Sequence, residues 1–156
     1  MKTNVMRLLD QAHIDYEVTT YDVKDGKIDG QAVAEKIGKN AKQVFKTLVA
    51  VGKTKTNYVF VIPVDLELDL KKAATGAGEK SIEMLPVKDL QKTTGYIRGG
   101  CSPIGMKKIF RTFIHESAKD LESITVSGGK VGVQITVSPE ELCRYIEGSF
   151  MDLTKA

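Results

Sequence analysis

The sequence is poor in the residue types that mark several classes of protein. It contains no tryptophan, four prolines, two cysteines and two histidines among 156 residues. Two cysteines, Cys101 and Cys143, are too few for the dense disulfide framework of a small secreted scaffold. The histidines, His13 and His115, are widely separated from each other and from the cysteines, so no zinc-binding spacing occurs. We therefore expect neither a metal nor a cofactor.

Long hydrophobic runs are also missing. The longest apolar run, Tyr58 to Val64, has the length of a strand and is far shorter than the roughly 18 residues of a membrane span. The residues from Met1 to Asn4 do not lead into the apolar stretch of a signal peptide. We expect no membrane contact, a cytoplasmic location and reduced thiols.

Charge of one sign is scarce as well. With 23 Lys and Arg against 20 Asp and Glu, the net charge is only +3, which by itself does not predict nucleic-acid binding. A hydrophobic content of 42% and a charged content of 28% are typical of a globular protein. No linker or repeat divides a chain of this length, so we expect one domain over residues 1–156.

Strand and helix patterns interleave along the chain. After an N-terminal helix that Asn4 caps, we expect strands over 16–21, 44–51, 58–64, 110–115, 123–127 and 131–137, and helices over 31–37, 71–77, 87–91 and 139–146. Gly128-Gly129 is expected to turn the last two strands into a hairpin. Several strand pairs would be hairpins, which favours an α+β fold with a mixed, largely antiparallel sheet and helices packed on it.

Lys46 stands out because it lies inside an otherwise apolar strand, between Phe45 and Thr47. Most such lysines are solvated and cover apolar surface with their stems. The alternative is a lysine held on a rigid strand and pointing into a cleft. There its ammonium group can hold a phosphate, a carbonyl or a ribose hydroxyl with three donors.

The segment from Gly95 to Gly105 holds four glycines and a proline, which indicates an unusual backbone path. It is either a wide turn or a nest of N–H groups close to a ligand oxygen. It is neither a Walker loop nor a dinucleotide fingerprint. Cys101 in this segment lacks an obvious base, so packing is the simpler reading than a nucleophile. Flanking basic residues are solvated surface unless the loop is an active site; these are Arg98, Lys107, Lys108 and Arg111.

Several segments, taken in order over nearly the whole chain, resemble the YbaK/EbsC family of free-standing aminoacyl-tRNA deacylases. That family is related to the editing domain inserted in bacterial prolyl-tRNA synthetases. The matching segments are Tyr21 and residues 43–48 (QVFKTL), 68–72 (LDLKK), 94–105 (TGYIRGGCSPIG) and 126–130 (VSGGK). The Lys-Thr-Leu strand combined with the Gly-Gly-x-Ser-Pro-x-Gly loop makes the resemblance specific.

The resemblance implies a barrel-like mixed central sheet surrounded by helices, with Lys46 as the catalytic residue. It implies a substrate-binding pocket formed by Tyr21, Phe45, Thr47, Gly99, Gly100, Cys101, Ser102, Pro103 and Gly105. The implied substrate is Cys-tRNA(Pro), with Cys-tRNA(Cys) as a further one. A synthetase pocket separates amino acids of similar volume by only ~1–3 kcal/mol, so editing must complete the discrimination.

The mechanism that the resemblance implies needs no protein nucleophile. The substrate thiol attacks its own ester carbonyl, cysteine leaves as a cyclic thiolactone, and backbone N–H groups of residues 99–102 stabilise the oxyanion. The implied partners are mischarged tRNA and prolyl-tRNA synthetase. Two alternatives stay open: a deacylase for alanine or serine, and a non-catalytic module that binds tRNA or a synthetase.

Overall fold

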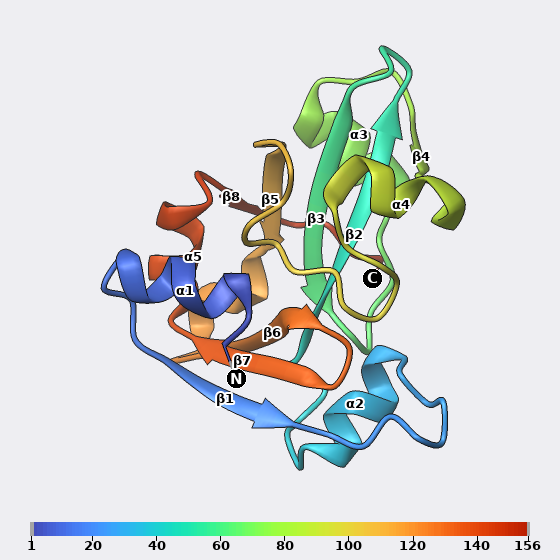
Figure 1. Cartoon of the computed structure of the whole chain (residues 1–156). Helices are drawn as coiled ribbons and strands as arrows, with labels where there is room; N and C mark the ends of the chain where they lie inside the picture. Colours follow the sequence, from blue (N-terminus) through green and yellow to red (C-terminus); the bar gives the residue numbers. More distant parts are fainter. Residues whose placement is uncertain (1, 156) are drawn as a thin grey trace.

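The computed structural model describes residues 2–155, in which two β-sheets are surrounded by helices (Figure 1). The elements are α1 (Asn4–Gln11), β1 (Tyr16–Thr20), α2 (Gly30–Lys36), β2 (Phe45–Gly52), β3 (Asn57–Pro63), α3 (Leu70–Ala77), β4 (Ile82–Met84), α4 (Val87–Thr94), β5 (Arg111–His115), the 3₁₀-helix η1 (Glu116–Asp120), β6 (Ile124–Lys130), β7 (Val133–Val137), α5 (Pro139–Tyr145) and β8 (Ser149–Met151).

The strands form a three-stranded sheet in the order β1-β7-β6 and a five-stranded sheet in the order β4-β2-β3-β5-β8. Every pair is antiparallel except β3–β5 and β5–β8, which are parallel. The expected α+β fold with a mixed, largely antiparallel arrangement is therefore confirmed. The barrel-like central sheet does not close into a barrel. Its strands divide into two sheets, which a parallel bridge between Val44 and Thr125 joins.

Side-chain caps start four of the helices where the sequence offers short polar residues. Asp29 caps α2, Asp69 caps α3, and Ser138 accepts a hydrogen bond from the Glu141 N–H at the start of α5. This bond is the Ser138 half of a capping box. At α1 the cap is Thr3, whose hydroxyl accepts from the Met6 N–H, so this helix starts one residue earlier than the sequence suggested.

The hairpin of β6 and β7 differs from the expectation. Gly128-Gly129 lies inside β6, where the register shifts between Ser127 and Lys130, and the chain turns at Val131-Gly132 instead. Gly129 and Gly132 both have positive φ, +93° and +92°, so both a bulge and a turn need glycine here. A bulge of this kind bends the strand that carries it.

The main core lies between the two sheets and under α1. It joins Val49, Val59 and Val61 of the five-stranded sheet to Val126 and Ile135 of the three-stranded sheet. A second cluster covers the other face of the five-stranded sheet, where alanines of α3 pack over the stacked rings of Phe60 and Phe113, 5.5 Å apart. With both faces covered, β2 and β3 form a rigid support, as strands buried on two sides require.

The two thiols have different surroundings. Cys101 and Cys143 are both free, and Cys143 is buried in the main core, where burial raises the pKa of its thiol. Cys143 therefore acts as a small apolar side chain.

Within residues 2–155, no three or more His, Cys, Asp or Glu side chains gather as a metal site. In the same range, no helix combines the length and the apolar character needed to cross a bilayer.

Candidate active site

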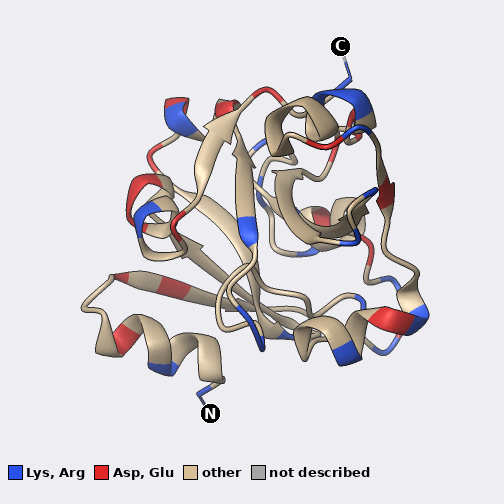
Figure 2. Ribbon diagram, turned by 90° about the horizontal axis from the view of Figure 1, so that it is seen from above, with Lys and Arg blue, Asp and Glu red and all other residues tan. Residues whose placement is uncertain are grey.

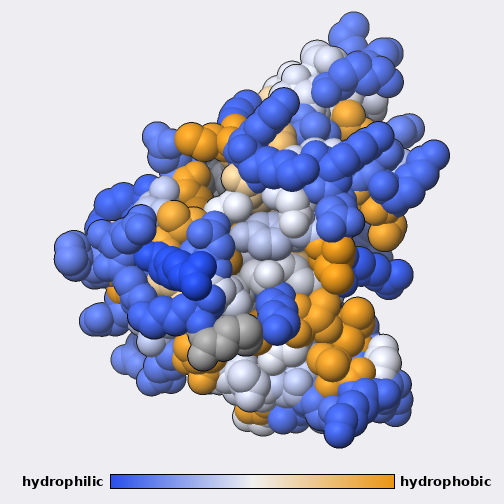
Figure 3. Space-filling model, in the orientation of Figure 1, coloured by the Kyte–Doolittle hydropathy of each residue, from blue (hydrophilic) through white to orange (hydrophobic). Residues whose placement is uncertain are grey.

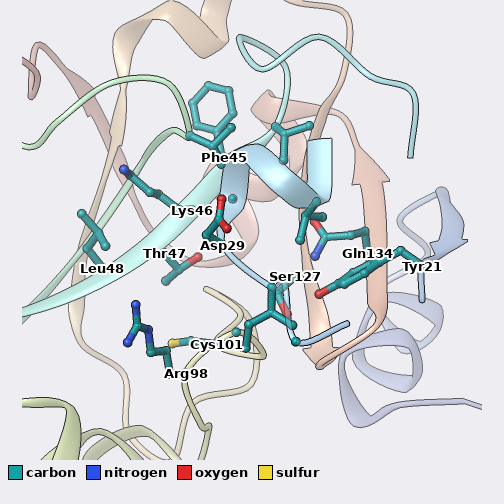
Figure 4. Close-up of a pocket in the computed structure, with 17 residues that line it drawn as sticks. Tyr21, Asp29, Phe45, Lys46, Thr47, Leu48, Arg98, Cys101, Ser127 and Gln134 are labelled. Carbon is teal, nitrogen blue, oxygen red and sulfur yellow. The ribbon is translucent and has the colours of Figure 1, made fainter. Parts of the chain in front are cut away.

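A pocket of about 620 Å³ opens between the N-terminal half of β2, the start of α2, the Gly-rich loop after α4 (residues 95–105) and the β6–β7 hairpin (Figure 4). This volume lies within the range of small-molecule sites. The lining residues come from five separate parts of the chain. They are Tyr21, Gly26, Ile28, Asp29, Gly30, Val33, Val44, Phe45, Lys46, Thr47, Leu48, Val64, Arg98, Gly99, Cys101, Ser127 and Gln134.

The pocket exists because β2 and β6 separate. The two strands meet at the Val44–Thr125 bridge, where the Thr125 N–H donates to the Gln43 carbonyl at 2.9 Å. Beyond this bridge, β2 pairs with β3 on one edge, and β4 joins the other edge only from Ala50 onward. An open strand edge therefore faces the cavity at residues 46–48.

The backbone of Thr47 points to that open edge. In the β2–β3 ladder the Val64 N–H donates to the Val44 carbonyl, and the Gly52 N–H donates to the Thr56 carbonyl. Residues of an antiparallel strand alternate between hydrogen-bonding to the partner strand and facing away from it. The even-numbered residues of β2 form the hydrogen bonds to β3, so the backbone N–H and C=O of Thr47 point away from β3. Its N–H and C=O are consequently available to a ligand in the pocket.

Two buried hydroxyl groups of the pocket have no hydrogen-bond partner. Across residues 2–155, four buried side-chain polar atoms are unsatisfied, and two of them, the Tyr21 hydroxyl and Thr47 Oγ1, line this pocket. A buried hydroxyl without a partner costs roughly 1–3 kcal/mol, so such groups are rare outside sites that receive a ligand. Their presence on opposite walls makes this cavity a candidate site for a polar ligand.

Lys46 lies at the rim of the same pocket and is partly exposed. Figure 4 shows Lys46 and Leu48 on one side of β2 and Thr47 on the other, as strand alternation requires. Within the described chain, its ammonium group forms no hydrogen bond or ion pair. Three donors on a rigid strand are thus free to meet an anionic or carbonyl oxygen at the edge of the cavity.

The Gly-rich loop is held in shape by its own hydrogen bonds. The Tyr96 hydroxyl donates to the Ile104 carbonyl, and the Gly100 N–H donates to the Ile97 carbonyl at 3.0 Å. Gly99 has a φ of +86°, which favours glycine. A Cβ on Gly100 would stand 3.1 Å from the Val131 nitrogen, so the loop approaches the β6–β7 turn too closely for a side chain.

The structure brings six of the ten candidate residues to the pocket and leaves four outside its lining. Tyr21, Phe45, Lys46, Thr47, Gly99 and Cys101 line it. Pro103 and Gly105 instead line a second hollow of about 290 Å³ on the far side of the loop. Ser102 is fully buried, and its hydroxyl accepts a hydrogen bond from the Ile104 N–H. Because the Gly100 N–H already bonds within the loop, it is not free to serve as an oxyanion donor.

Ser127 and Gln134 line the pocket but were not among the sequence candidates. They face each other across β6 and β7, and both are buried. The available signal was a polar side chain on the inward face of an otherwise apolar strand, which is unusual unless it meets a partner. Asp29 and Arg98 also reach the cavity, and Arg98 is exposed at its rim.

Cys101 does not have the properties of a nucleophile. Burial raises the pKa of its thiol to about 12, so the thiolate is scarce at neutral pH. No histidine is part of the described pocket lining, and His115 instead accepts a hydrogen bond from the Leu153 N–H. The pocket therefore supplies shape, polar groups and positive charge, and an attacking atom must come from elsewhere.

A Cys101→Ala variant is accordingly expected to keep its activity within about threefold of the wild type, because it loses only a partly exposed pocket contact. The variant is compared with the wild type in a deacylation assay, with circular dichroism as the control for folding. A folded but inactive variant would show that the thiol takes part in the reaction.

Positive charge is spread over the molecule and does not form one basic face. Figure 2 shows basic and acidic segments alternating around the chain, in keeping with the net charge of +3. Figure 3 shows hydrophilic residues over much of this face, with hydrophobic residues exposed between them. A large nucleic acid would therefore be held by a few local cations and not by a broad electrostatic field.

Comparison with known proteins connects this site to translation. Residues 28–145 match the family of the aminoacyl-tRNA editing domain. The chain is 46% identical over 153 residues to EbsC of Enterococcus faecalis, provisionally named a Cys-tRNA(Pro)/Cys-tRNA(Cys) deacylase, covering 98% of this chain and 93% of that protein. A 93-residue stretch, 58% of this chain, is 29% identical to 16% of a proline–tRNA ligase of Brachyspira hyodysenteriae.

Solved structures support the fold. One of them, provisionally described as a trans-editing enzyme for prolyl tRNA synthetase, superimposes with a TM-score of 0.84. The two sequences are 21% identical, and the match covers 100% of this chain and 99% of the other. At that identity the likeness establishes a shared fold.

Proposed function

Because the chain belongs to the aminoacyl-tRNA editing domain family, we propose that it is a deacylase that removes cysteine from mischarged Cys-tRNA(Pro), and also from Cys-tRNA(Cys). The observation that carries this proposal is the pocket, which joins an unpaired lysine and two unpaired hydroxyls but no ionised nucleophile. Such a site suits a substrate that brings its own attacking group.

Two features of the pocket support binding of an aminoacylated ribose. The cavity of about 620 Å³ has room for an aminoacyl group with the sugar that carries it. Polar groups differ in their exposure, with Ser127 and Gln134 buried on the β6–β7 wall and Lys46 partly exposed at the rim. The inner groups can accept hydrogen bonds from the substrate ammonium, while the rim faces the ribose.

The chemistry is a transfer of the acyl group from oxygen to sulfur. The cysteine thiol attacks the ester carbonyl carbon, a C–S bond forms, and the C–O bond to the ribose breaks. The thiol proton ends on the ribose oxygen, and cysteine leaves as a thiolactone that water later opens. Holding the thiol beside the carbonyl can contribute up to roughly 7–11 kcal/mol, since the two groups no longer have to find each other.

Lys46 serves as the electrostatic group of this reaction. As the carbonyl is attacked, negative charge grows on its oxygen and then on the leaving ribose oxygen. An ammonium group held on a rigid strand can stabilise either oxygen without rearranging. The backbone N–H of Thr47 lies on the same open edge and is a second donor for the carbonyl oxygen.

Arg98 is proposed to contact a phosphate of the single-stranded tRNA 3′ end, because it is exposed where the pocket opens. An Arg98→Ala variant should raise KM several-fold with little change in kcat. The slope of log KM against log salt should fall by roughly 0.7, the value for one lost phosphate contact on a single strand. Arg144→Ala, which removes an exposed arginine of α5, is the matched control. An unchanged slope would place the RNA elsewhere.

The experiment that tests the proposed function is a deacylation panel. Cys-tRNA(Pro), Cys-tRNA(Cys), Ala-tRNA(Pro) and Ser-tRNA(Pro) are each incubated with the protein, with and without prolyl-tRNA synthetase. The proposal predicts rapid loss of cysteine and a synthetase effect on the choice of tRNA. If no cysteine is released from either tRNA under both conditions, the proposed function is wrong, and a binding module becomes the better explanation.

A further inference from the structure

The connection between β1 and α2, residues 21–29, forms the outer wall of the pocket. Tyr21, Gly26, Ile28 and Asp29 all contribute to the lining. The Ile28 side chain reaches across to the Gly-rich loop, since its Cδ1 lies only 2.7 Å from where a Cβ on Gly99 would be. This connection therefore spans the mouth of the cavity from one wall to the other.

The connection has little hydrophobic packing to hold it there. Residues 22–27 are all exposed, and Val23, the apolar residue among them, is 40% exposed. Turns within the segment add local bonds, such as the one from the Gly26 N–H to the Val23 carbonyl at 3.1 Å. A segment with so few buried contacts opens easily unless something outside it ties it down.

Lys36, at the end of α2, supplies that tie. Its ammonium group donates to the Asp22 carbonyl at 2.7 Å, to Asp25 Oδ1 at 2.7 Å and to the Lys27 carbonyl at 2.9 Å. All three of its donors are thus used on one segment. The same ammonium lies 5.8 Å from the ring centre of Tyr21, within range of a cation–π contact.

This arrangement differs from an ordinary surface ion pair. The Lys36 side chain is only 20% exposed, and it contacts the segment at three points instead of one. Single exposed pairs contribute little, whereas charge-assisted bonds that converge on one shielded group are stronger. Hydrogen bonding to Lys36 also lowers the pKa of the Asp25 carboxyl.

We propose that Lys36 is a positioning residue, which holds the connection of residues 21–29 closed over the pocket and thereby sets the affinity for the aminoacyl end of tRNA. Lys36 itself is not part of the pocket lining, so it acts through Tyr21 and Ile28. The inference rests on the proposed function, because it assigns a role in binding that same substrate.

The proposal predicts a particular kinetic signature. Without the tie, the closed form is a smaller fraction of the free protein, and the apparent affinity falls by that fraction. Bound substrate still closes the segment, so the chemical step at saturation is kept. Lys36→Met should raise KM about tenfold or more and change kcat less than about twofold. The control is Lys39→Met, which replaces a nearby lysine that does not bond to the segment. It should change neither KM nor kcat.

Limited trypsin digestion gives a second measurement that does not depend on turnover. Lys24 and Lys27 lie in the connection, and cleavage after them, followed by mass spectrometry, reports its opening. Cleavage should be about tenfold faster in Lys36→Met than in the wild type or Lys39→Met. An amide analogue of cysteinyl-adenosine, which cannot be deacylated, should slow the cleavage of the wild type.

Unchanged KM together with unchanged trypsin cleavage in Lys36→Met would overturn the proposal, as would a loss confined to kcat. Should Lys36→Met fail to fold, Asp25→Ala removes one exposed acceptor and should show the same signature to a smaller degree; no change there would also overturn it. A wild type inactive on every tRNA refutes the proposed function alone. In that case faster cleavage of the variant supports the tie, and equal cleavage overturns it.

Discussion

Replacing Lys46 with alanine is expected to lower kcat/KM for Cys-tRNA(Pro) by at least about a hundredfold, the typical loss when one donor to a developing oxyanion is removed. The ammonium group has no partner in the described structure that its removal would leave unsatisfied. It also lies on the partly exposed N-terminal half of β2, so the fold should persist. Single-turnover deacylation and a thermal unfolding curve measure the two effects separately.

The control for this variant is Lys53→Ala, which removes an exposed lysine from the loop after β2. It should match the wild type in both assays. A Lys46→Arg variant keeps the charge but changes the donor geometry, and should recover only part of the rate. If the folded Lys46→Ala variant keeps full activity, the lysine is a solvated strand residue and the electrostatic role is wrong.

Exchanging the substrate thiol for a hydroxyl is expected to have the largest effect. Ser-tRNA(Pro) should be deacylated on the order of a thousandfold more slowly than Cys-tRNA(Pro), because an internal thiol has a high effective concentration and a hydroxyl is a weak nucleophile at neutral pH. The two amino acids differ in one atom, so pocket binding alone cannot produce this ratio. Rates are compared at saturating protein to remove differences in affinity.

Ala-tRNA(Pro), which has no side-chain nucleophile, is the matched substrate control and should be as slow as the serine ester. Quenching the cysteine reaction early and analysing the products by mass spectrometry should reveal the thiolactone before free cysteine accumulates. Equal rates for the three esters would instead mean that water is the nucleophile, held by the protein.

Elements with strong local signals could be predicted well from the sequence. The helix after Ser138 and the apolar strands β2 and β3 were predicted to within one or two residues of their observed ends. The short edge strands β4 and β8, of three residues each, were missed because their pairing is with distant segments. The parallel pairing of β3 with β5 crosses about fifty residues and has no local signature.

The site was predictable in part for a related reason. Lys46 stood out because a charge in an apolar strand is locally unusual. Gly100 belongs to the expected motif, yet its N–H bonds within the loop, and that follows only from the loop geometry. Ser127 lines the pocket just before the bulge of β6, where the sequence indicated a hairpin turn instead. The contacts of Lys36 could not be predicted, because they depend on the path of residues 21–29, which form no helix or strand.

A crystal structure of this protein with the amide analogue of cysteinyl-adenosine would show directly whether the substrate occupies this pocket. We expect the aminoacyl group between β2 and the Gly-rich loop, with hydrogen bonds to the Tyr21 hydroxyl and Thr47 Oγ1 and with the ribose beside Lys46. An analogue bound outside this pocket, with both hydroxyls still lacking partners, would contradict this expectation.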